Sequence, residues 1–140
     1  MTEPAPVRLQ FSARQADTLR REAVAAYPHE CCGLLVGEGA GDVLVTDVVA
    51  ATNTAGNPSR RFTIDPQAHF DLLRTARGNG RRVVGHYHSH PDGGATPSPH
   101  DLAMAHDSEA IWVVMTTSAG TASVPRAFRH LSGENGFIEL

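Results

Sequence analysis

The chain has few of the features that mark secreted, membrane-spanning or nucleic-acid-binding proteins. Its two cysteines, Cys31 and Cys32, are adjacent, and a disulfide between neighbours would be strained and would close no useful loop, which excludes a disulfide scaffold. No apolar run approaches the ~18 residues that a membrane span needs. Twelve basic and 15 acidic residues give a net charge of −3, so no electrostatic surface for a nucleic-acid backbone is expected.

Residues 1–10 also lack the basic stretch and following apolar stretch of an export signal. The composition is that of an ordinary globular protein, with 41% hydrophobic and 19% charged residues. A length of 140 residues corresponds to about one domain, which we expect to span 1–140 and to bury a core without disulfides. We therefore expect a cytoplasmic protein with no membrane or nucleic-acid partner.

Capping residues and apolar spacing predict two main helices. The segment 12–15 reads as a capping box, so a helix is expected from there to just before Pro28. Asp65 followed by Pro66 is a typical helix start, and Gly78 or Gly80 is expected to end that second helix.

Short apolar runs bounded by turn residues predict strands, and a third, short helix is expected to begin at Ser98 or Pro99 and to carry Asp101. The strands are expected at 31–37, 42–50, 62–64, 82–88 and 110–116, with one or two edge strands in 126–131 and 136–140. Because helices are interspersed among these strands, we predict a single-domain α/β fold with a mixed central sheet flanked by helices.

Histidine is the unusual feature of the sequence, since five of the eight lie within 21 residues, at positions 86, 88, 90, 100 and 106. Side chains two residues apart share a face of an extended strand, so His88 and His90 can converge on one ion. Neutral imidazole is a favoured zinc ligand, and Asp101, at the expected helix start, is a natural third ligand. Three protein ligands plus water is the arrangement of a catalytic zinc site.

His86 lies on the same strand face, which makes a site of three histidines a competing interpretation. Residues 86 and 90 are roughly 13 Å apart along an extended strand, too far for both to reach one metal easily. We expect His86 to be a hydrogen-bonded core residue, and we expect the histidines without a matching partner, among them His69, to lie at the surface.

A zinc-bound water needs a general base within hydrogen-bond reach. The candidate carboxylates outside the histidine segment include Glu22, Glu30, Glu38, Asp47, Asp65 and Asp71. Glu30 is the best of these on local grounds, because it stands directly before a buried strand, where its pKa could be raised toward neutrality. Composition and spacing alone leave the others open.

These residues resemble the motif of JAMM/MPN+ metalloprotease domains, in which an upstream glutamate is followed by His-(Ser/Thr)-His, seven residues, Ser, two residues and Asp. Here the motif reads His88-Ser89-His90, then residues 91–97, then Ser98 and Asp101. The segment Glu30-Cys-Cys-Gly-Leu-Leu35 resembles the one that carries the glutamate of this family, and residues 53–65 are similar to those of its small stand-alone bacterial members. The resemblance covers about residues 8–138.

The resemblance implies a three-layer α/β/α fold like that of cytidine deaminases, with one Zn²⁺ per chain held by His88, His90 and Asp101. It implies that Glu30 takes the proton of the metal-bound water, and that Ser98 donates a hydrogen bond to the oxyanion on the scissile carbonyl. The expected enzyme is a zinc metalloprotease that hydrolyses a peptide or isopeptide bond after the C-terminal Gly-Gly of a ubiquitin-like protein of the sulfur-carrier type.

The extended tail of that partner is expected to add to an exposed strand edge near the metal. Residues 53–61 and the strand 62–64 are the elements expected to form the slot for the Gly-Gly tail. The sequence leaves open whether the protein forms a homodimer.

Several residues have a structural alternative. Ser98, directly before Pro99, also suits a helix N-cap. Cys32 resembles a packed core residue of the family. The pairs Arg60-Arg61 and Arg81-Arg82 are expected to be solvated, with docking of an acidic partner as the alternative.

Two rival functions remain. The first is a non-catalytic MPN-type scaffold that binds proteins, which would lack one ligand or the glutamate, and none of these is missing here. The second is a zinc enzyme of the nucleobase-deaminase kind, which would need a Pro-Cys-x-x-Cys ligand pair that this sequence does not contain.

Overall fold

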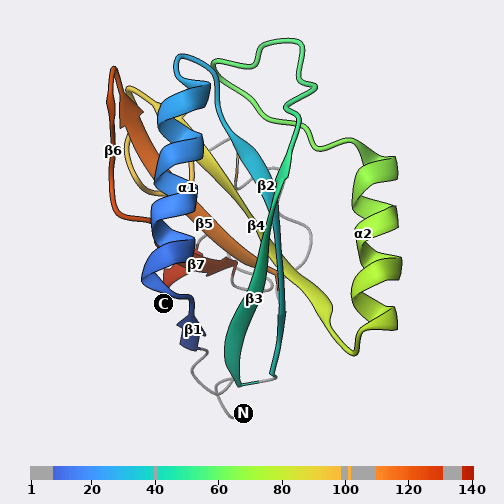
Figure 1. Cartoon of the computed structure of the whole chain (residues 1–140). Coiled ribbons are helices and arrows are strands. Elements are labelled where there is room, and N and C mark those ends of the chain that lie inside the picture. Colours follow the sequence, from blue (N-terminus) through green and yellow to red (C-terminus); the bar gives the residue numbers. More distant parts are fainter. Residues whose placement is uncertain (1–7, 40, 99–100, 102–109, 131–136) are drawn as a thin grey trace.

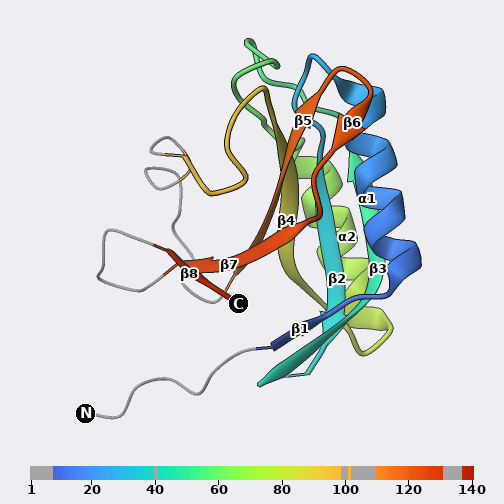
Figure 2. The ribbon, with the colours of Figure 1, turned by 90° about the vertical axis from the view of Figure 1, so that its left-hand side faces the viewer.

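The computed structural model describes residues 8–39, 41–98, 101, 110–130 and 137–140. Its elements are β1 (Arg8–Gln10), α1 (Ala13–Ala26), β2 (Cys32–Glu38), β3 (Asp42–Ala51), α2 (Pro66–Gly78), β4 (Arg82–Pro91), β5 (Ile111–Ser118), β6 (Thr121–Ala122), β7 (Arg126–His130) and β8 (Phe137–Glu139). The strands form one sheet in the order β1-β3-β2-β4-β5-β7-β8, and β6 pairs with β5 (Figure 2). The pairs β1–β3 and β4–β5 are parallel and the others are antiparallel, which confirms the predicted mixed α/β fold.

Both main helices begin where the capping residues predict. The Ser12 side chain accepts a hydrogen bond from the Gln15 N–H at 3.1 Å, and the Gln15 side chain accepts from the Ser12 N–H at 2.8 Å. The Asp65 carboxylate accepts from the Gln67 N–H at 3.1 Å, with Pro66 as the first residue of α2. These bonds satisfy N–H groups that every helix start leaves without an internal partner.

The two helices lie on opposite sides of the sheet (Figure 1). Leu19 and Ala23 of α1 belong to a buried apolar cluster with side chains of β2, β4 and β5, including Leu35 and Met115. On the other face, His69 of α2 lines a pocket together with side chains of the same three strands. The central strands are therefore covered on both faces, as a three-layer arrangement requires.

The segment 62–64 corrects one prediction, because it is not a strand. It forms a single antiparallel bridge, between Asn53 and Ile64. The Asn53 side-chain oxygen takes the Thr63 N–H at 3.1 Å, so this hydrogen bond serves the loop and not a strand ladder. The expected slot is thus made of loop backbone that the Asn53 side chain organises.

The other differences from the prediction concern the end of β4, two short strands and the third helix. β4 runs three residues beyond the predicted His88, because its parallel pairing with β5 continues to Pro91 opposite Thr117. The short strands β1 and β6 were not predicted, since three and two residues are too few to show a periodic pattern. Of the predicted third helix only Asp101 is described, as a helical residue, and the rest of that prediction lies outside the described residues.

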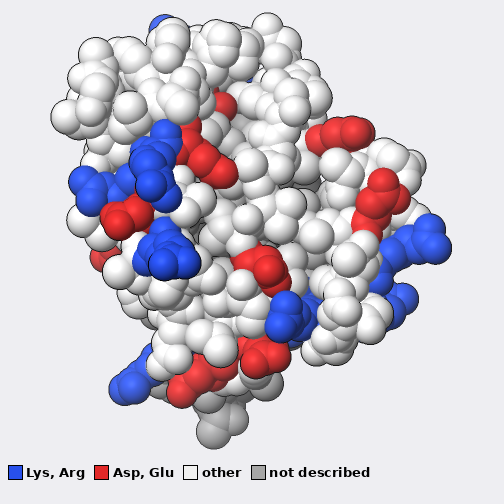
Figure 3. Space-filling view, in the orientation of Figure 1, with Lys and Arg blue, Asp and Glu red and all other residues white. Residues whose placement is uncertain are grey.

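Charged residues of both signs alternate over the face shown in Figure 3, and no broad basic surface appears on it. Within the described part of the chain, neither helix is long and apolar enough to cross a membrane.

Candidate active site

β4 lies between β2 and β5 in the sheet and carries the histidine segment. The alternation along this strand puts His88 and His90 on the face covered by α2, while Tyr87 and Ser89 point to the α1 face. His88 and Ser89 are fully buried, and His90 is partly buried. The Nε2 atoms of His88 and His90 are 3.1 Å apart. The predicted convergence of the two imidazoles is present.

Asp101 is the third group at this point. Its Oδ2 lies 3.1 Å from His88 Nε2 and 3.0 Å from His90 Nε2, and the residue is 4% exposed. Asp101 Oδ2 also accepts from the Ser98 N–H at 2.8 Å, while the Ser98 hydroxyl accepts from the Asp101 N–H at 3.0 Å. This reciprocal pair is the pattern of a helix capping box, and it fixes the carboxylate against the two imidazoles.

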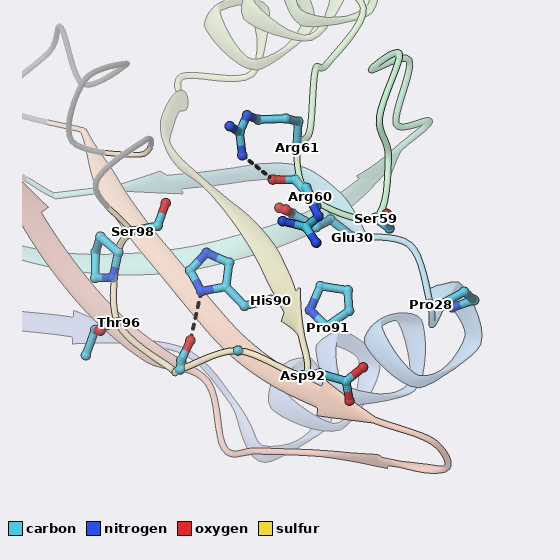
Figure 4. Close-up of a pocket in the computed structure, with 13 residues that line it drawn as sticks. Pro28, Glu30, Ser59, Arg60, Arg61, His90, Pro91, Asp92, Thr96 and Ser98 are labelled. Carbon is cyan, nitrogen blue, oxygen red and sulfur yellow. Dashed lines mark hydrogen bonds between the residues drawn. The ribbon is translucent and has the colours of Figure 1, made fainter.

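The contact of His90 Nδ1 shows which ring nitrogen carries the proton when the imidazole is neutral. His90 Nδ1 lies 2.8 Å from the Gly94 carbonyl oxygen, and because a carbonyl only accepts, Nδ1 is the donor (Figure 4). In the neutral ring, Nε2 then presents its lone pair toward His88 and Asp101.

The spacing of the three atoms fits a metal ion. A tetrahedral zinc ion with bonds of ~2.0–2.1 Å keeps its ligand atoms ~3.3 Å apart, close to the 3.0–3.1 Å found here. Two nitrogens and a carboxylate oxygen at this separation need a proton or a cation between them. His88, His90 and Asp101 therefore have the chemistry and the geometry to hold a divalent cation.

Burial and hydrogen bonds set the charges of these groups. Burial holds the pKa of His88 below its usual range, so its ring is neutral near pH 7. Burial opposes ionisation of Asp101, but hydrogen bonds from His88 and His90 outweigh it and hold the pKa of that carboxyl well below its usual range. Burial also opposes the charged form of His90, yet hydrogen bonds to Asp101 and Gly94 raise its pKa. The ionised Asp101 carboxylate and the neutral His88 ring are in the state that a divalent ion requires, whereas a protonated His90 must release its proton when the ion binds.

Glu30 stands across from the histidines, at the end of the chain segment that enters β2. One ligand atom each of Glu30, His88 and His90 lie within 4.8 Å of one another. Glu30 is 5% exposed, and burial raises its pKa to about 7. Of the two carboxylates near the histidines, Asp101 is in direct contact with both rings and is the better candidate ligand. Glu30 has the pKa that suits a general base near neutral pH.

The main chain around Glu30 is held from three directions. The Glu30 N–H donates to the Pro58 carbonyl at 2.7 Å, and the Asn53 side-chain amide donates to the Glu30 carbonyl at 3.1 Å. The next N–H, that of Cys31, donates to the Ser89 hydroxyl at 2.8 Å, and the Ser89 N–H donates to the Cys31 carbonyl at 3.2 Å. Ser89 thus ties the chain beside Glu30 to the strand that carries both histidines.

The sequence analysis placed Ser89 in the motif and Asn53 in the loop but assigned neither side chain a role. The Asn53 amide also donates to the Pro58 and Arg61 carbonyls, at 3.3 and 2.9 Å, and its oxygen accepts from the Ala55 and Thr63 N–H groups. A signal for Ser89 was available, because a serine between two histidines on a central strand must point to the opposite, apolar face. For Asn53 the only local signal was a polar residue at a strand end.

His86 is not part of the metal-ligand cluster. Its ring packs against Trp112 at 4.3 Å and against Phe62 at 5.4 Å between centroids. The expected hydrogen bond is missing at its buried Nε2, which has no partner among the described residues. Burial lowers the pKa of His86 to about 3, so the ring is neutral. His69, expected at the surface, is partly buried and lines the same pocket as His86.

Two pockets flank these groups. The larger, about 890 Å³, is lined by Glu30, His90 and Ser98 and by arginines of the loop 53–61 (Figure 4). The smaller, about 610 Å³, has mainly apolar walls, and its lining includes Leu34, Phe62, Ile64, His86, Asp101 and Trp112. Arg61 lines both pockets, so they adjoin at that residue.

The two cysteines are buried and free. Burial raises the pKa of Cys31 to about 11 and that of Cys32 to about 12, so both are thiols near neutral pH. They are packing residues, as expected for Cys32.

Comparison with known proteins identifies the family. Residues 12–131 match the family of prokaryotic homologs of the JAB domain. The chain belongs to this family. The recognition of a JAMM/MPN-type domain from its motif is thereby confirmed.

Two relatives and one solved structure are informative. The chain is 32% identical to the desampylase of Haloferax volcanii over 102 residues, which are 70% of this chain and 73% of the relative. It is 37% identical to a probable TtuB-protein conjugate cleaving protease of Thermus thermophilus over 93 residues, 66% of this chain and 59% of that protein. A solution structure of a Desulfitobacterium hafniense protein is similar with a TM-score of 0.79 and 28% identity, and covers 96% of this chain and 89% of that one.

Proposed function

We propose that this JAB domain is a zinc-dependent isopeptidase that hydrolyses the bond after the C-terminal Gly-Gly of a ubiquitin-like protein. The enzyme class, a JAMM-type isopeptidase, is confirmed by the family and by the two relatives named for cleaving conjugates. The observation that carries the zinc mechanism is the meeting of His88, His90 and Asp101 at 3.0–3.1 Å beside the buried Glu30.

His88, His90 and Asp101 would hold the ion in this mechanism. Zinc, when bound, supplies an acidified water and polarises the scissile carbonyl. Glu30 takes a proton from the attacking water, and its pKa of about 7 allows it to carry that proton to the leaving amine. The anchored main chain on both sides of Glu30 keeps its carboxylate opposite the histidines through both proton transfers.

Ser98 has one role that the structure describes and one that we propose. Its hydroxyl oxygen accepts the Asp101 N–H, which leaves the hydroxyl proton free to donate. Because Ser98 also lines the larger pocket, that proton can stabilise negative charge on the carbonyl oxygen of a bound substrate. The capping and the oxyanion roles use different atoms of one side chain and are compatible.

A ubiquitin-like tail is the proposed substrate because of the names of the two relatives, which are a desampylase and a probable TtuB-protein conjugate cleaving protease. The smaller pocket, with mainly apolar walls beside Asp101, is the proposed path of the tail. The organisation as a single domain over 1–140 and the cytoplasmic location remain predictions.

The test is cleavage of a fusion between a ubiquitin-like protein ending in Gly-Gly and a reporter, together with zinc analysis. Glu30→Gln is expected to retain zinc and to lower kcat by about 10²–10⁴-fold, because only the general base is removed. Glu38→Gln, an exposed glutamate at the end of β2, is the matched control and should behave like the wild type. Bound zinc with no cleavage by the wild type would favour the scaffold, and unchanged cleavage by Glu30→Gln would remove Glu30 from the mechanism.

A further inference from the structure

The two arginine pairs of this chain have different surroundings. Arg81 forms an ion pair with Asp47 at 3.1 Å, and Arg82 donates to the Gly39 carbonyl, so these side chains are engaged within the protein. Arg60 and Arg61 line the larger pocket, and within the described ranges neither guanidinium forms an ion pair. One pair is structural, while the other presents positive charge to the pocket of the candidate active site.

The backbone that carries Arg60 and Arg61 is fixed. Both N–H groups donate to the Asn57 carbonyl, at 3.1 and 2.9 Å, and the Asn53 amide donates to the Arg61 carbonyl at 2.9 Å. The Arg61 guanidinium donates to the Arg60 carbonyl at 2.9 Å (Figure 4). The two side chains therefore start from a rigid turn, which lowers the entropy cost of binding a ligand with them.

The carboxylates of the same pocket do not neutralise these arginines. Asp92 accepts a hydrogen bond from the Tyr27 hydroxyl at 2.8 Å. Glu30 is buried beside the histidines and forms no ion pair with Arg60 or Arg61. Within the described residues no carboxylate forms an ion pair with Arg60 or Arg61, so a bound ligand can supply one.

The proposed chemistry decides which part of a substrate meets the arginines. The leaving nitrogen must come within hydrogen-bond reach of Glu30 to receive its proton. Glu30 lines the larger pocket, together with Arg60 and Arg61, and does not line the smaller one. The leaving component therefore occupies the larger pocket, while the tail of the modifier occupies the smaller one.

We propose that Arg60 and Arg61 bind a carboxylate that the leaving component carries close to its amine. Conjugates whose leaving component carries such a carboxylate are then the preferred substrates. This inference rests on the proposed isopeptidase function. A guanidinium offers a planar pair of N–H donors that matches a carboxylate, and charge-assisted hydrogen bonds of this kind are among the strongest in proteins. The carboxylate has two sources, the α-carboxylate of an amino acid joined through its own amine and an acidic side chain next to a modified lysine.

The experiment uses two pairs of conjugates of one Gly-Gly-ending ubiquitin-like protein. The first pair joins it to alanine or to alaninamide, and the second joins it to the lysine of a blocked peptide with glutamate or glutamine after that lysine. The acidic member of at least one pair is expected to have a kcat/KM about 10-fold higher. Which pair shows the preference identifies the source of the carboxylate.

Variants separate the arginines from intrinsic differences in amine basicity, which are the same for every enzyme form. Arg60→Ala and Arg61→Ala are expected to bring the acid-to-neutral ratio toward one, and the matched control Arg81→Ala should keep the wild-type ratio. Equal rates within both pairs for the wild type would overturn the inference. A preference that survives in the double variant of Arg60 and Arg61 would do the same.

A binding measurement keeps this test independent of turnover. The side-chain Nε–H signals of ¹⁵N-labelled arginines, assigned with the single variants, are followed while alanine, alaninamide or the two peptides are added to the zinc-loaded protein. Shifts of the Arg60 and Arg61 signals with the acidic ligands alone support the inference, and identical responses to acidic and neutral ligands contradict it. Failure of all conjugates to be cleaved would instead refute the proposed function.

Discussion

The two faces of the central sheet are built from different residues. On the α1 face, buried apolar side chains of the helix and the strands pack against one another, among them Leu19, Leu35 and Met115. On the α2 face, the strands carry His86 and His88 beside Trp112, and α2 itself buries only Ala76. The first face is a closed core, whereas the second borders a pocket of about 610 Å³.

A single strand serves both faces because its side chains alternate. Tyr87 and Ser89 of β4 point into the α1 face, while His88 and His90 point to the other. A rigid core directly behind the strand thus holds His88 and His90 in place, while the third candidate ligand, Asp101, reaches them from outside the strand. The comparison predicts that substitutions on the α1 face change stability and that those on the α2 face change chemistry.

Neighbouring leucines of β2 give the largest expected difference. Leu35→Ala removes a side chain that is 2% exposed within the α1-face core, and it should destabilise the protein by about 2–5 kcal/mol. Leu34→Ala lies on the other face beside the smaller pocket, so the cost should fall at or below the lower end of this range. Denaturant unfolding measures both. Leu35→Ala should keep the kcat/KM of the folded fraction, whereas Leu34→Ala should reduce it, and the reverse pattern would contradict the division of the faces.

Glu30→Gln should stabilise the metal-free protein, an effect opposite to that of a core substitution. Burial raises the pKa of Glu30 from 4.5 to about 7 in the folded state, so ionisation opposes folding. The wild type therefore loses stability as the pH rises from about 4.5 to about 7, and the variant does not. Their difference should be near zero at pH 4 and should level off above pH 7 at up to about 3 kcal/mol.

Unfolding in the presence of a chelator, at several pH values, measures this difference. Glu38→Gln is the control, since this exposed side chain should give no such pH-dependent gain. A Glu30→Gln variant that is less stable than the wild type at pH 8 would show that the carboxylate is solvated or paired in the folded protein.

Local patterns predicted the parts of the fold that depend on neighbours in sequence. The capping box of α1 and the Asp65-Pro66 start of α2 need only the residues that form them, and the pairing of His88 with His90 follows from strand alternation. The motif spacing predicted that Asp101 joins them, through the resemblance to a known family. Neither the local patterns nor the motif predicted the hydrogen bonds that anchor the chain around Glu30, such as the bond from Cys31 to Ser89 and the bonds of the Asn53 side chain. The strand expected at 62–64 failed for the same reason, because the Thr63 N–H bonds to the Asn53 side chain and the segment forms only a single bridge.

Ser89 links the two faces and should affect catalysis from the α1 side. Its hydroxyl takes the Cys31 N–H beside Glu30, so Ser89→Ala should let Glu30 shift and should lower kcat by about 10-fold, with KM and zinc content nearly unchanged. Ser89→Thr keeps the hydroxyl and should restore part of the rate. Thr117→Val, which removes another buried hydroxyl with no partner among the described residues, is the matched control. In a Glu30→Gln background, Ser89→Ala should cost little more, because both changes act through one group.

Tyr87→Phe should give the smallest effect and should be confined to stability. The Tyr87 hydroxyl donates to the Glu22 carboxylate at 2.5 Å, joining β4 to α1 within the α1 face. Burial already raises the pKa of Glu22, and loss of this hydrogen bond leaves the half-buried carboxylate with one donor fewer. The expected cost is about 1 kcal/mol in the free energy of unfolding. Tyr27→Phe, which removes an exposed hydrogen bond to Asp92, should cost less, and a Tyr87→Phe variant that loses activity without losing stability would show that the two faces are coupled.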